Sequence, residues 1–217
     1  MEYDVVIVGA GPAGLTAAIK LKQLDPNLNV CILEKGAEVG AHILSGNVFE
    51  TKALDELIPD WKNEGAPVKT KVSKEKFLFL GKNSSLSWPT WLLPSVQKNH
   101  KNYIISLANL CRWLAEQAEK LGVEIFPGFP ASEVLYNDDG SVKGVATLDM
   151  GLDKEGNKKD TYQEGMELHA KVTVFSEGCR GHLGKQLIKK FNLDEGKNSQ
   201  QYGIGLKEIW EVSEQQH

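Results

Sequence analysis

The sequence has few cysteines, no long apolar run and no excess of positive charge. Three cysteines stand far apart among 217 residues, without a CxxC spacing, so neither a disulfide framework nor a metal site is supported. The formal net charge of -4 gives no reason to expect nucleic-acid binding. The apolar run from Val5 is broken by glycines and by Pro12, so no segment is long enough to span a bilayer. The N-terminus lacks the basic region of a signal or transit peptide, which argues against export.

Side chains that would supply chemistry of their own are also missing. The sequence shows no Ser-His-Asp arrangement, no carboxylate pair and no cluster of metal ligands. Cys31 alternates within an apolar strand and Cys111 lies on the apolar face of a helix, so both are predicted to be core residues. Cys179, beside two glycines, stays open as a neighbour of a cofactor. Any chemistry would therefore belong to a cofactor that the protein holds.

The composition is that of a soluble globular protein. Hydrophobic residues make up 41% of the chain and charged residues 25%, with no internal repeat or low-complexity segment. A chain of 217 residues can bury a substantial core, as one large domain or as part of a two-domain protein.

The most informative stretch is residues 1–36, which predict a strand, a glycine turn, a helix, a second strand and an acidic residue. Gly9, Gly11 and Gly14 form a GxGxxG pattern between an apolar strand and a helix. Glu34 ends the second strand about 20 residues further on. Gly9 permits the tight turn, a side chain at Gly11 would collide with a pyrophosphate, and Gly14 lets helix and strand approach. Free amides at the helix start would face the phosphates, so this stretch predicts a dinucleotide site.

Glu34 and the loop after it narrow the choice of dinucleotide. A glutamate here accepts hydrogen bonds from ribose hydroxyls and repels a 2′-phosphate, which disfavours NADP and leaves NAD and FAD. The segment from Gly36 to Gly46 is too irregular for the helix that would usually continue a nicotinamide domain. Such a loop suits the longer FAD molecule, whose ribityl chain and ring need lining beyond the first turn. FAD is therefore favoured over NAD.

Downstream, the periodicity of apolar residues predicts a mixed α/β architecture. The expected elements are a helix at 49–58, an irregular region at 59–100, a helix at 103–121, a strand at 123–126, a hairpin of 133–136 and 142–148, a polar loop around 153–160, strands at 166–169 and 171–176, and a helix around 183–191. The antiparallel strands are expected to form a small layer that covers the parallel sheet. The predicted fold class is a Rossmann-like α/β domain with a parallel sheet, flanking helices and that small antiparallel layer.

The last residues predict an element without partners. Residues 202–212 have the pattern of a strand, yet only five residues follow. We therefore expect a fragment in which residues 201–217 begin an incomplete second domain. The expected division is a discontinuous FAD-binding domain at 1–58 and 102–200, interrupted by an insertion at 59–101.

Residues 69–101 form a basic segment, rich in aromatic residues, inside an acidic chain. They contain seven lysines against a single acid, Glu75, and two apolar clusters at 77–80 and 88–94. Exposed aromatic rings flanked by lysines suit the headgroup region of an anionic membrane. The alternative is a hairpin packed on a core of its own, and the sequence alone leaves the two interpretations even.

Seven motifs together resemble a known family. They are the glycine fingerprint, GAHILSG (40–46), PDWK (59–62), GSVKG (140–144), ELHAK (167–171), EGCRGHL (177–183) and YGIGLKE (202–208). In this order they closely resemble electron transfer flavoprotein:ubiquinone oxidoreductase over nearly the whole chain. The first motif is shared by many flavoproteins, whereas the others are specific. Geranylgeranyl reductases and aromatic hydroxylases are similar only in the FAD elements.

The resemblance implies a membrane-associated enzyme with FAD and a [4Fe-4S] cluster. Such an enzyme takes electrons from reduced electron transfer flavoprotein and passes them to ubiquinone. The family's cluster cysteines lie far toward the C-terminus, so this chain is expected to hold FAD without the cluster and to be inactive by itself. The resemblance also makes 59–101 a membrane- and quinone-associated insertion. It implies a peripheral position on the cytoplasmic face of a bacterial inner membrane or on the mitochondrial inner membrane.

The resemblance also assigns an FAD site. Its residues here are Gly9, Gly11, Pro12, Ala13, Gly14, Glu34, Lys35, Gly40, Ala41, His42, Ser45, Gly46, Val134, Glu177 and Gly178. The loop at 40–46 would approach the flavin ring, with an ordinary surface loop as the alternative. His42 would orient or protonate near the flavin, or else be satisfied by backbone. Arg180 would neutralise phosphate, or else be solvated. Glu177 and Gly178 resemble the motif that meets the pyrophosphate, where aspartate is more usual than glutamate.

Two other functions stay open. One is a flavin-dependent reductase or hydroxylase of an isoprenoid or aromatic substrate, which a downstream cysteine cluster would exclude. The other is a non-catalytic FAD-binding module, which stable flavin without an electron acceptor would indicate.

Overall fold

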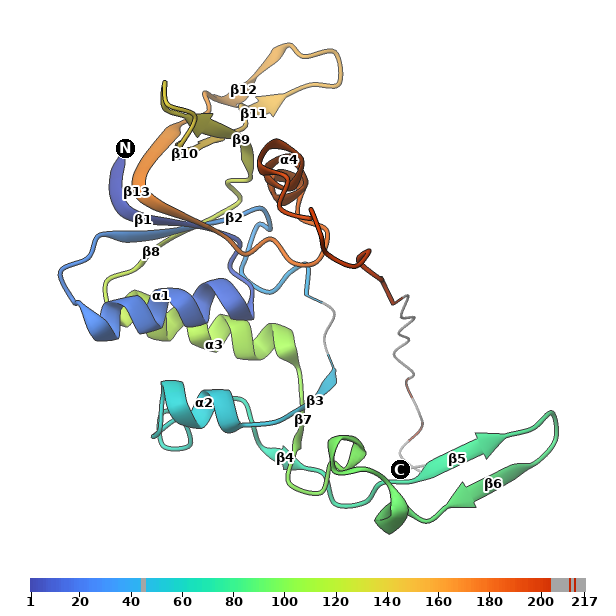
Figure 1. The fold of residues 1–217 in the computed structure, drawn as a ribbon. Helices are drawn as coiled ribbons and strands as arrows, with labels where there is room; N and C mark the ends of the chain where they lie inside the picture. The colour runs from blue at the N-terminus through green and yellow to red at the C-terminus, as the bar shows by residue number, and fades with distance from the viewer. Residues whose placement is uncertain (44–45, 204–210, 212, 214–217) are drawn as a thin grey trace.

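The chain folds around a six-stranded mixed sheet. The computed structural model describes residues 1–43, 46–203, 211 and 213. The strands follow the order β8-β2-β1-β13-β10-β9 (Figure 1). Their bounds are β1 Glu2–Val8, β2 Val30–Glu34, β8 Glu124–Pro127, β9 Ala131–Tyr136, β10 Val142–Thr147 and β13 Glu167–Phe175. β8, β2, β1 and β13 run parallel to one another, and β10 and β9 continue the sheet in antiparallel orientation. The predicted α/β class is confirmed.

The first 36 residues fold as the sequence predicts. Helix α1, Pro12–Leu24, begins directly after the glycine turn, with Gly11 as its N-cap. Pro12 occupies the first helical turn, where its fixed φ suits the helix and its missing N–H is not needed. β1 and β2 are buried along almost their whole length, which is typical of parallel strands covered on both faces.

Helices cover the two faces of the sheet. α1 and α3, Leu107–Lys120, lie side by side on one face (Figure 1), where their apolar residues share a core cluster with Ile7 of β1. On the opposite face, Val6 of β1 belongs to a second cluster, together with Leu183 of α4, His182–Phe191. Alternate residues of one strand therefore supply two cores, because successive side chains point to opposite faces.

The helix that the sequence places at 103–121 begins four residues later, at Leu107. Tyr103–Ile105 form strand β7, which pairs with two short strands. These are β3 Asn47–Phe49 and β4 Thr70–Lys71. Ser106 separates strand from helix, because its side chain accepts a hydrogen bond from the backbone N–H of Asn109 and caps α3. The apolar stripe crosses this boundary because β7 and α3 bury residues in the same cluster. The earlier helix is also shorter than expected: Phe49 belongs to β3, and α2 spans Lys52–Leu57.

The antiparallel part of the fold corrects two expectations. The strands expected at 166–169 and 171–176 are one continuous strand, β13. Its first residues pair with β10, and from His169 onward it pairs with β1. The hairpin of β9 and β10 therefore extends the parallel sheet edge to edge and does not form a separate covering layer, because β13 pairs with both parts.

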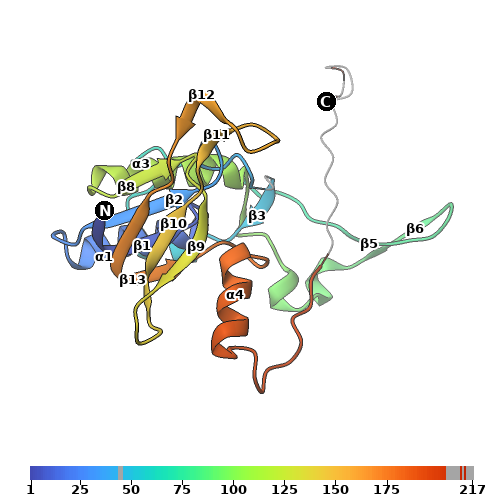
Figure 2. The same cartoon turned by 90° about the horizontal axis from the view of Figure 1, so that it is seen from above.

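Two hairpins stand apart from the main sheet. β5, Phe77–Leu80, and β6, Ser85–Trp88, project away from it and are followed by the short 3-10 helices η1 Thr90–Leu92 and η2 Ser95–Gln97 (Figures 1 and 2). The polar loop expected around 153–160 is the turn of a further hairpin, between β11 Met150–Leu152 and β12 Lys158–Gln163, and only its last three residues belong to β12. Most of the strand expected at 202–212 lies outside the described residues. No described helix has both the length and the apolar character needed to cross a membrane.

Candidate functional site

A cavity of about 940 Å³ opens at the carboxyl ends of β1, β2 and β13. This is the edge of an α/β sheet at which ligands usually bind, and the volume is near the upper end of ligand pockets. Ten of the predicted site residues line it: Gly9, Gly11, Pro12, Ala13, Glu34, Lys35, Gly40, His42, Glu177 and Gly178. The fold thus brings together three segments that lie far apart in the sequence.

The three glycines of the turn have different surroundings. Gly9 has a φ of +105°, and a Cβ atom there would lie 2.7 Å from the carbonyl oxygen of Ser176. A Cβ atom at Gly14 would overlap the carbonyl oxygen of Gly9 and lie 2.7 Å from the Oγ of Ser176. A Cβ atom at Gly11 would meet no atom of the described residues within 4 Å, although Gly11 lines the cavity. The first and third glycines therefore serve the fold, and the second leaves room for a ligand.

Glu34 is held by backbone amides at the mouth of the turn. Its Oε2 accepts a hydrogen bond of 2.9 Å from the N–H of Ala10, and its Oε1 accepts one of 2.7 Å from the N–H of Gly36. The carboxylate therefore braces the glycine turn against the following loop while facing the cavity. A carboxylate oxygen has more than one acceptor site, so both oxygens can still accept from ribose hydroxyls.

We expect a Glu34→Gln variant to bind FAD more weakly, because the charged acceptor is lost and the new amide group faces a backbone N–H. The loss is expected to be about 1.5–3 kcal/mol, the usual range for a hydrogen bond to a charged group. The dissociation constant would rise roughly 10- to 150-fold. Titration of the apoprotein with FAD measures it, with Glu56→Gln, an exposed glutamate on α2, as the matched control. Equal affinities in the two variants would contradict the role of Glu34.

The loop after Glu34 is packed against the start of α3. Val39 is buried in the larger core cluster, and Gly40, with a φ of +88°, approaches α3 so closely that a Cβ atom would lie 2.8 Å from the carbonyl oxygen of Ala108. Glu38 forms an ion pair of 3.0 Å with Arg112 of α3. The loop is thereby fixed along one side of the cavity, with Gly40 and His42 in its lining.

Glu177 has a role that the sequence did not suggest. Its Oε1 accepts a hydrogen bond of 3.1 Å from the N–H of Leu183, and its Oε2 accepts one of 2.8 Å from the N–H of Gly184. The N-cap residue of α4, Gly181, has no side chain to do this. Glu177 therefore caps α4 and places the loop of Gly178 and Arg180 on the cavity.

The remaining predicted site residues lie elsewhere. Gly14, Ala41 and Gly46 do not line the cavity, and Ser45 lies outside the described residues. Val134 is buried in the second core cluster, and its strand reaches the cavity through Ala131 and Ser132.

Ser176 also lines the cavity, although no motif of the sequence pointed to it. Its Oγ lies 3.0 Å from the carbonyl oxygen of Val8 and 3.1 Å from that of Gly9, and its hydroxyl donates to them. Its position at the end of β13, immediately before Glu177, was the available signal, because the ends of parallel strands meet at one edge.

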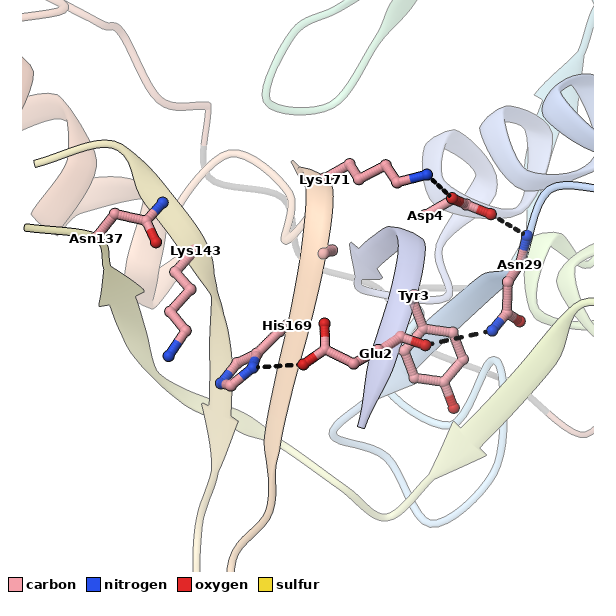
Figure 3. Close-up of a pocket in the computed structure, with 9 residues that line it drawn as sticks. Glu2, Tyr3, Asp4, Asn29, Asn137, Lys143, His169 and Lys171 are labelled. Atoms are coloured by element: carbon pink, nitrogen blue, oxygen red, sulfur yellow. Dashed lines mark hydrogen bonds and ion pairs between the residues drawn. The ribbon is translucent and has the colours of Figure 1, made fainter. Parts of the chain in front are cut away.

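A second hollow, of about 540 Å³, lies at the opposite, amino ends of β1 and β13 (Figure 3). Four of its polar side chains contact one another in pairs: His169 lies 2.9 Å from Glu2, and Lys171 lies 2.7 Å from Asp4. Because the glycine turn lies at the other end of the same strands, this hollow is not the dinucleotide site.

The cysteines match their predicted places. Cys31 and Cys111 are fully buried, in different core clusters, and burial raises the pKa of the Cys31 thiol to about 12 and that of Cys111 to about 11. Both are therefore poor nucleophiles and poor metal ligands. Cys179 is exposed. Within the described part of the chain, no three or more His, Cys, Asp or Glu side chains are grouped so that they could hold a metal ion.

Solved structures share this fold. A THI4 protein from Thermovibrio ammonificans superposes with a TM-score of 0.55 at 20% identity, over 88% of this chain and 63% of its own. A geranylgeranyl bacteriochlorophyll reductase-like protein from Thermoplasma acidophilum superposes with a TM-score of 0.54 at 21% identity, over 80% of this chain and 38% of its own. Residues 1–57 match the Thi4 family. That match covers the β1–α1–β2 unit and the loop after it, less than half of the chain.

Curated relatives are similar along the whole chain. An electron transfer flavoprotein-ubiquinone oxidoreductase of Pseudomonas aeruginosa is 57% identical over 223 residues, which cover 100% of this chain and 40% of that protein. The mitochondrial proteins of the same name from Dictyostelium discoideum and Homo sapiens are 55% and 53% identical, covering 100% and 98% of this chain but 36% and 35% of their own lengths. The chain therefore spans well under half of the relatives it matches. Along its length it is homologous to the N-terminal portion of electron transfer flavoprotein-ubiquinone oxidoreductases and belongs to that family.

Proposed function

We propose that this chain binds FAD in the cavity at the carboxyl ends of β1, β2 and β13. We propose further that it forms the FAD-binding part of an enzyme that passes electrons from reduced electron transfer flavoprotein to ubiquinone. The observation that carries the proposal is the 57% identity along the entire chain to a protein named for that activity. The cavity supplies independent support, because its residues fit a dinucleotide.

The fit rests on the shape and the donors of the cavity. Gly11 leaves open space where a pyrophosphate would approach the backbone, and the first turn of α1 has N–H groups without partners inside the helix. Glu34 faces the cavity as an acceptor for ribose hydroxyls. Gly40 and His42 line it further along, where the longer part of FAD would lie.

FAD, when bound, would supply the capacity to accept and donate electrons. The residues of this chain bind and orient it: the glycine turn receives the pyrophosphate, Glu34 the ribose, and the loop held by Val39 and Gly40 limits the access of water. No nucleophile or proton donor of the protein is needed for electron transfer.

A [4Fe-4S] cluster, which the family resemblance implies, would need ligands outside this chain. Cys31 and Cys111 are buried on different faces of the sheet, and Cys179 is exposed on a third element. The three thiols therefore cannot converge on one cluster.

The experiment is to express the chain, release its cofactor with acid and identify it by chromatography. FAD is expected, and NAD or FMN would contradict the proposal. A second measurement follows the quinone-dependent oxidation of reduced electron transfer flavoprotein, comparing this chain with a full-length relative. We expect turnover by the relative only, because the chain lacks most of the relative's length. Turnover by this chain would place the whole electron path within its 217 residues. A chain that retains FAD, while an extended version also shows no turnover, would instead be a non-catalytic FAD-binding module.

We propose that the insertion at 59–101 contacts an anionic membrane surface without crossing it. Every residue of β5 and β6 is exposed, and Leu80 reaches 78%. Phe77, Phe79 and Trp88 make edge-to-face contacts, with ring centroids 5.3 and 6.1 Å apart, on one face of the hairpin. The hairpin projects away from the sheet (Figure 2), so its apolar residues are not packed on a core of their own within the described chain. Seven lysines in residues 69–101 would attract anionic lipid.

Replacing Trp88 and Trp91 together by serine is expected to reduce co-sedimentation with anionic liposomes, because two exposed rings no longer enter the headgroup region. High salt is expected to weaken the remaining binding, since lysines supply it. The matched control replaces Leu24 and Leu193 by serine, two exposed apolar residues outside the insertion. Membrane contact by the hairpin is rejected if the tryptophan variant binds as the wild type does and salt has no effect.

A further inference from the structure

Arg180 is a cation in the lining of the cavity that has no anionic partner among the described residues. It lies in the loop between β13 and α4 and lines the cavity together with Gly178 and Gly181. Among the residues that the structure describes, Arg180 donates no hydrogen bond and pairs with no carboxylate. The two glutamates in the same lining, Glu34 and Glu177, accept hydrogen bonds from backbone amides, and neither forms an ion pair with Arg180.

The guanidinium of Arg180 is held from one side by an aromatic ring. Its Cζ lies 5.0 Å from the centre of the Tyr202 ring. Tyr202 donates a hydrogen bond of 2.8 Å from its hydroxyl to Gln200, and the Gln200 side chain donates one of 3.3 Å to the carbonyl oxygen of Cys179. The segment at 200–202 is thereby fixed to the loop that carries Arg180. A guanidinium stacked on a ring keeps its five N–H donors in its own plane, free to bind an anion.

The cavity has one helix start available for an anion, not two. The first amides of α4 already donate to Glu177, whereas the start of α1 faces the cavity through Gly11 and Ala13. Arg180 comes from the loop after β13, and the α1 start comes from the loop after β1, the neighbouring strand. A ligand phosphate at the α1 start therefore has Arg180 as a cation on the side of β13.

We propose that Arg180 binds the pyrophosphate of the dinucleotide and that Tyr202 positions its guanidinium for this contact. The inference rests on the proposed FAD site and adds to it a binding residue and a positioning residue. It also links the segment at 200–202 to the occupancy of the cavity, because the ring that holds Arg180 belongs to that segment.

The test measures the FAD dissociation constant of the apoprotein at low and high salt for the wild type, Arg180→Gln, Arg180→Lys, Tyr202→Phe and Tyr202→Leu. Loss of a charged hydrogen-bonding partner predicts a dissociation constant at least ~10-fold higher for Arg180→Gln, with a smaller dependence on salt. The dissociation constant of Arg180→Lys is expected to lie between those of the wild type and Arg180→Gln, because lysine keeps the positive charge but lacks the planar guanidinium. Tyr202→Phe should bind like the wild type, since it keeps the stacking ring. Tyr202→Leu should raise the FAD dissociation constant by at least ~3-fold, because the cation–ring contact that positions Arg180 is lost.

Lys185→Gln is the matched control, because it removes a positive charge from the exposed side of α4. ADP and adenosine serve as additional probes: the loss in Arg180→Gln should appear with ADP and be absent with adenosine. Wild-type affinity and salt dependence in Arg180→Gln would overturn the inference and leave the FAD site intact. A wild-type chain that binds no FAD would overturn the proposed function instead. If Arg180→Gln melts at a lower temperature than the wild type without ligand, its weaker binding could reflect loss of folding. The FAD dissociation constants of Arg180→Lys and Tyr202→Leu then test the inference. Wild-type affinity in both variants would reject the contact between Arg180 and the pyrophosphate.

Discussion

A Gly11→Val variant is expected to fold like the wild type and to bind no FAD. Gly11 has φ and ψ angles of -78° and 179°, which a residue of any type can adopt, and a Cβ atom there meets no atom within 4 Å in the part of the chain that the structure describes. The added side chain would point into the cavity, where a pyrophosphate must approach the backbone closely. Ligand binding is therefore lost without loss of packing. Cofactor content and the melting temperature of the apoprotein are the two measurements.

Gly203→Val is the matched control for that variant. With respect to the described residues, Gly203 has equally open surroundings and does not line the cavity, so this variant should keep its FAD. Retention of FAD by Gly11→Val would remove the glycine turn from the ligand site. A large fall in the melting temperature of the Gly11→Val apoprotein would show that Gly11 supports the fold as well.

A Gly14→Ala variant is expected to show the opposite behaviour, with the fold destabilised whether or not FAD is present. The new methyl group would overlap the carbonyl oxygen of Gly9 and lie 2.7 Å from the Oγ of Ser176. The backbone of Gly9 cannot shift to make room, because it lies close to the backbone of Ser176. Overpacking usually lowers the free energy of unfolding by about 1–3 kcal/mol. Because the methyl group would meet a backbone atom that cannot move, we expect a loss of about 3 kcal/mol or more for this variant. Urea unfolding of the apoprotein measures it.

Helix propensity predicts a change in stability of the opposite sign. Alanine is normally better than glycine inside a helix by about 1 kcal/mol, so helix propensity alone predicts stabilisation. Gly184→Ala in α4 is the matched control, because a Cβ atom there would make only an ordinary contact, 3.6 Å from the Oε2 of Glu177. We expect this control to be neutral or slightly stabilised. Equal unfolding free energies for the two variants would mean that the turn can open to admit a side chain at Gly14.

The boundaries of elements were harder to predict than their existence. An apolar stripe from Tyr103 to Leu121 predicts one helix, but its first residues form β7, since a strand and a helix that bury residues in the same cluster share an apolar pattern. The prediction of two separate strands at 166–169 and 171–176, and of a covering antiparallel layer, was wrong for a related reason. Strand pairing depends on contacts between segments distant in sequence, and β13 pairs with β1 and β10 at once. Local periodicity contains no information about such partners.

The sequence by itself determined the dinucleotide unit, the family and ten residues of the cavity lining. The residues of that unit follow one another closely, so that glycine turn, helix start and acidic residue are fixed by local chain geometry. Only the tertiary structure decided what lies opposite them. It brought Ser176 against Gly9 and Gly14, gave Glu177, which lines the cavity, the further role of capping α4, and placed Arg180 beside Tyr202 in the lining of the cavity. Some of these roles depend on contacts between residues far apart in the sequence. Ser176 and Val8, for example, are 168 positions apart, and their hydrogen bond forms only when the sheet is assembled.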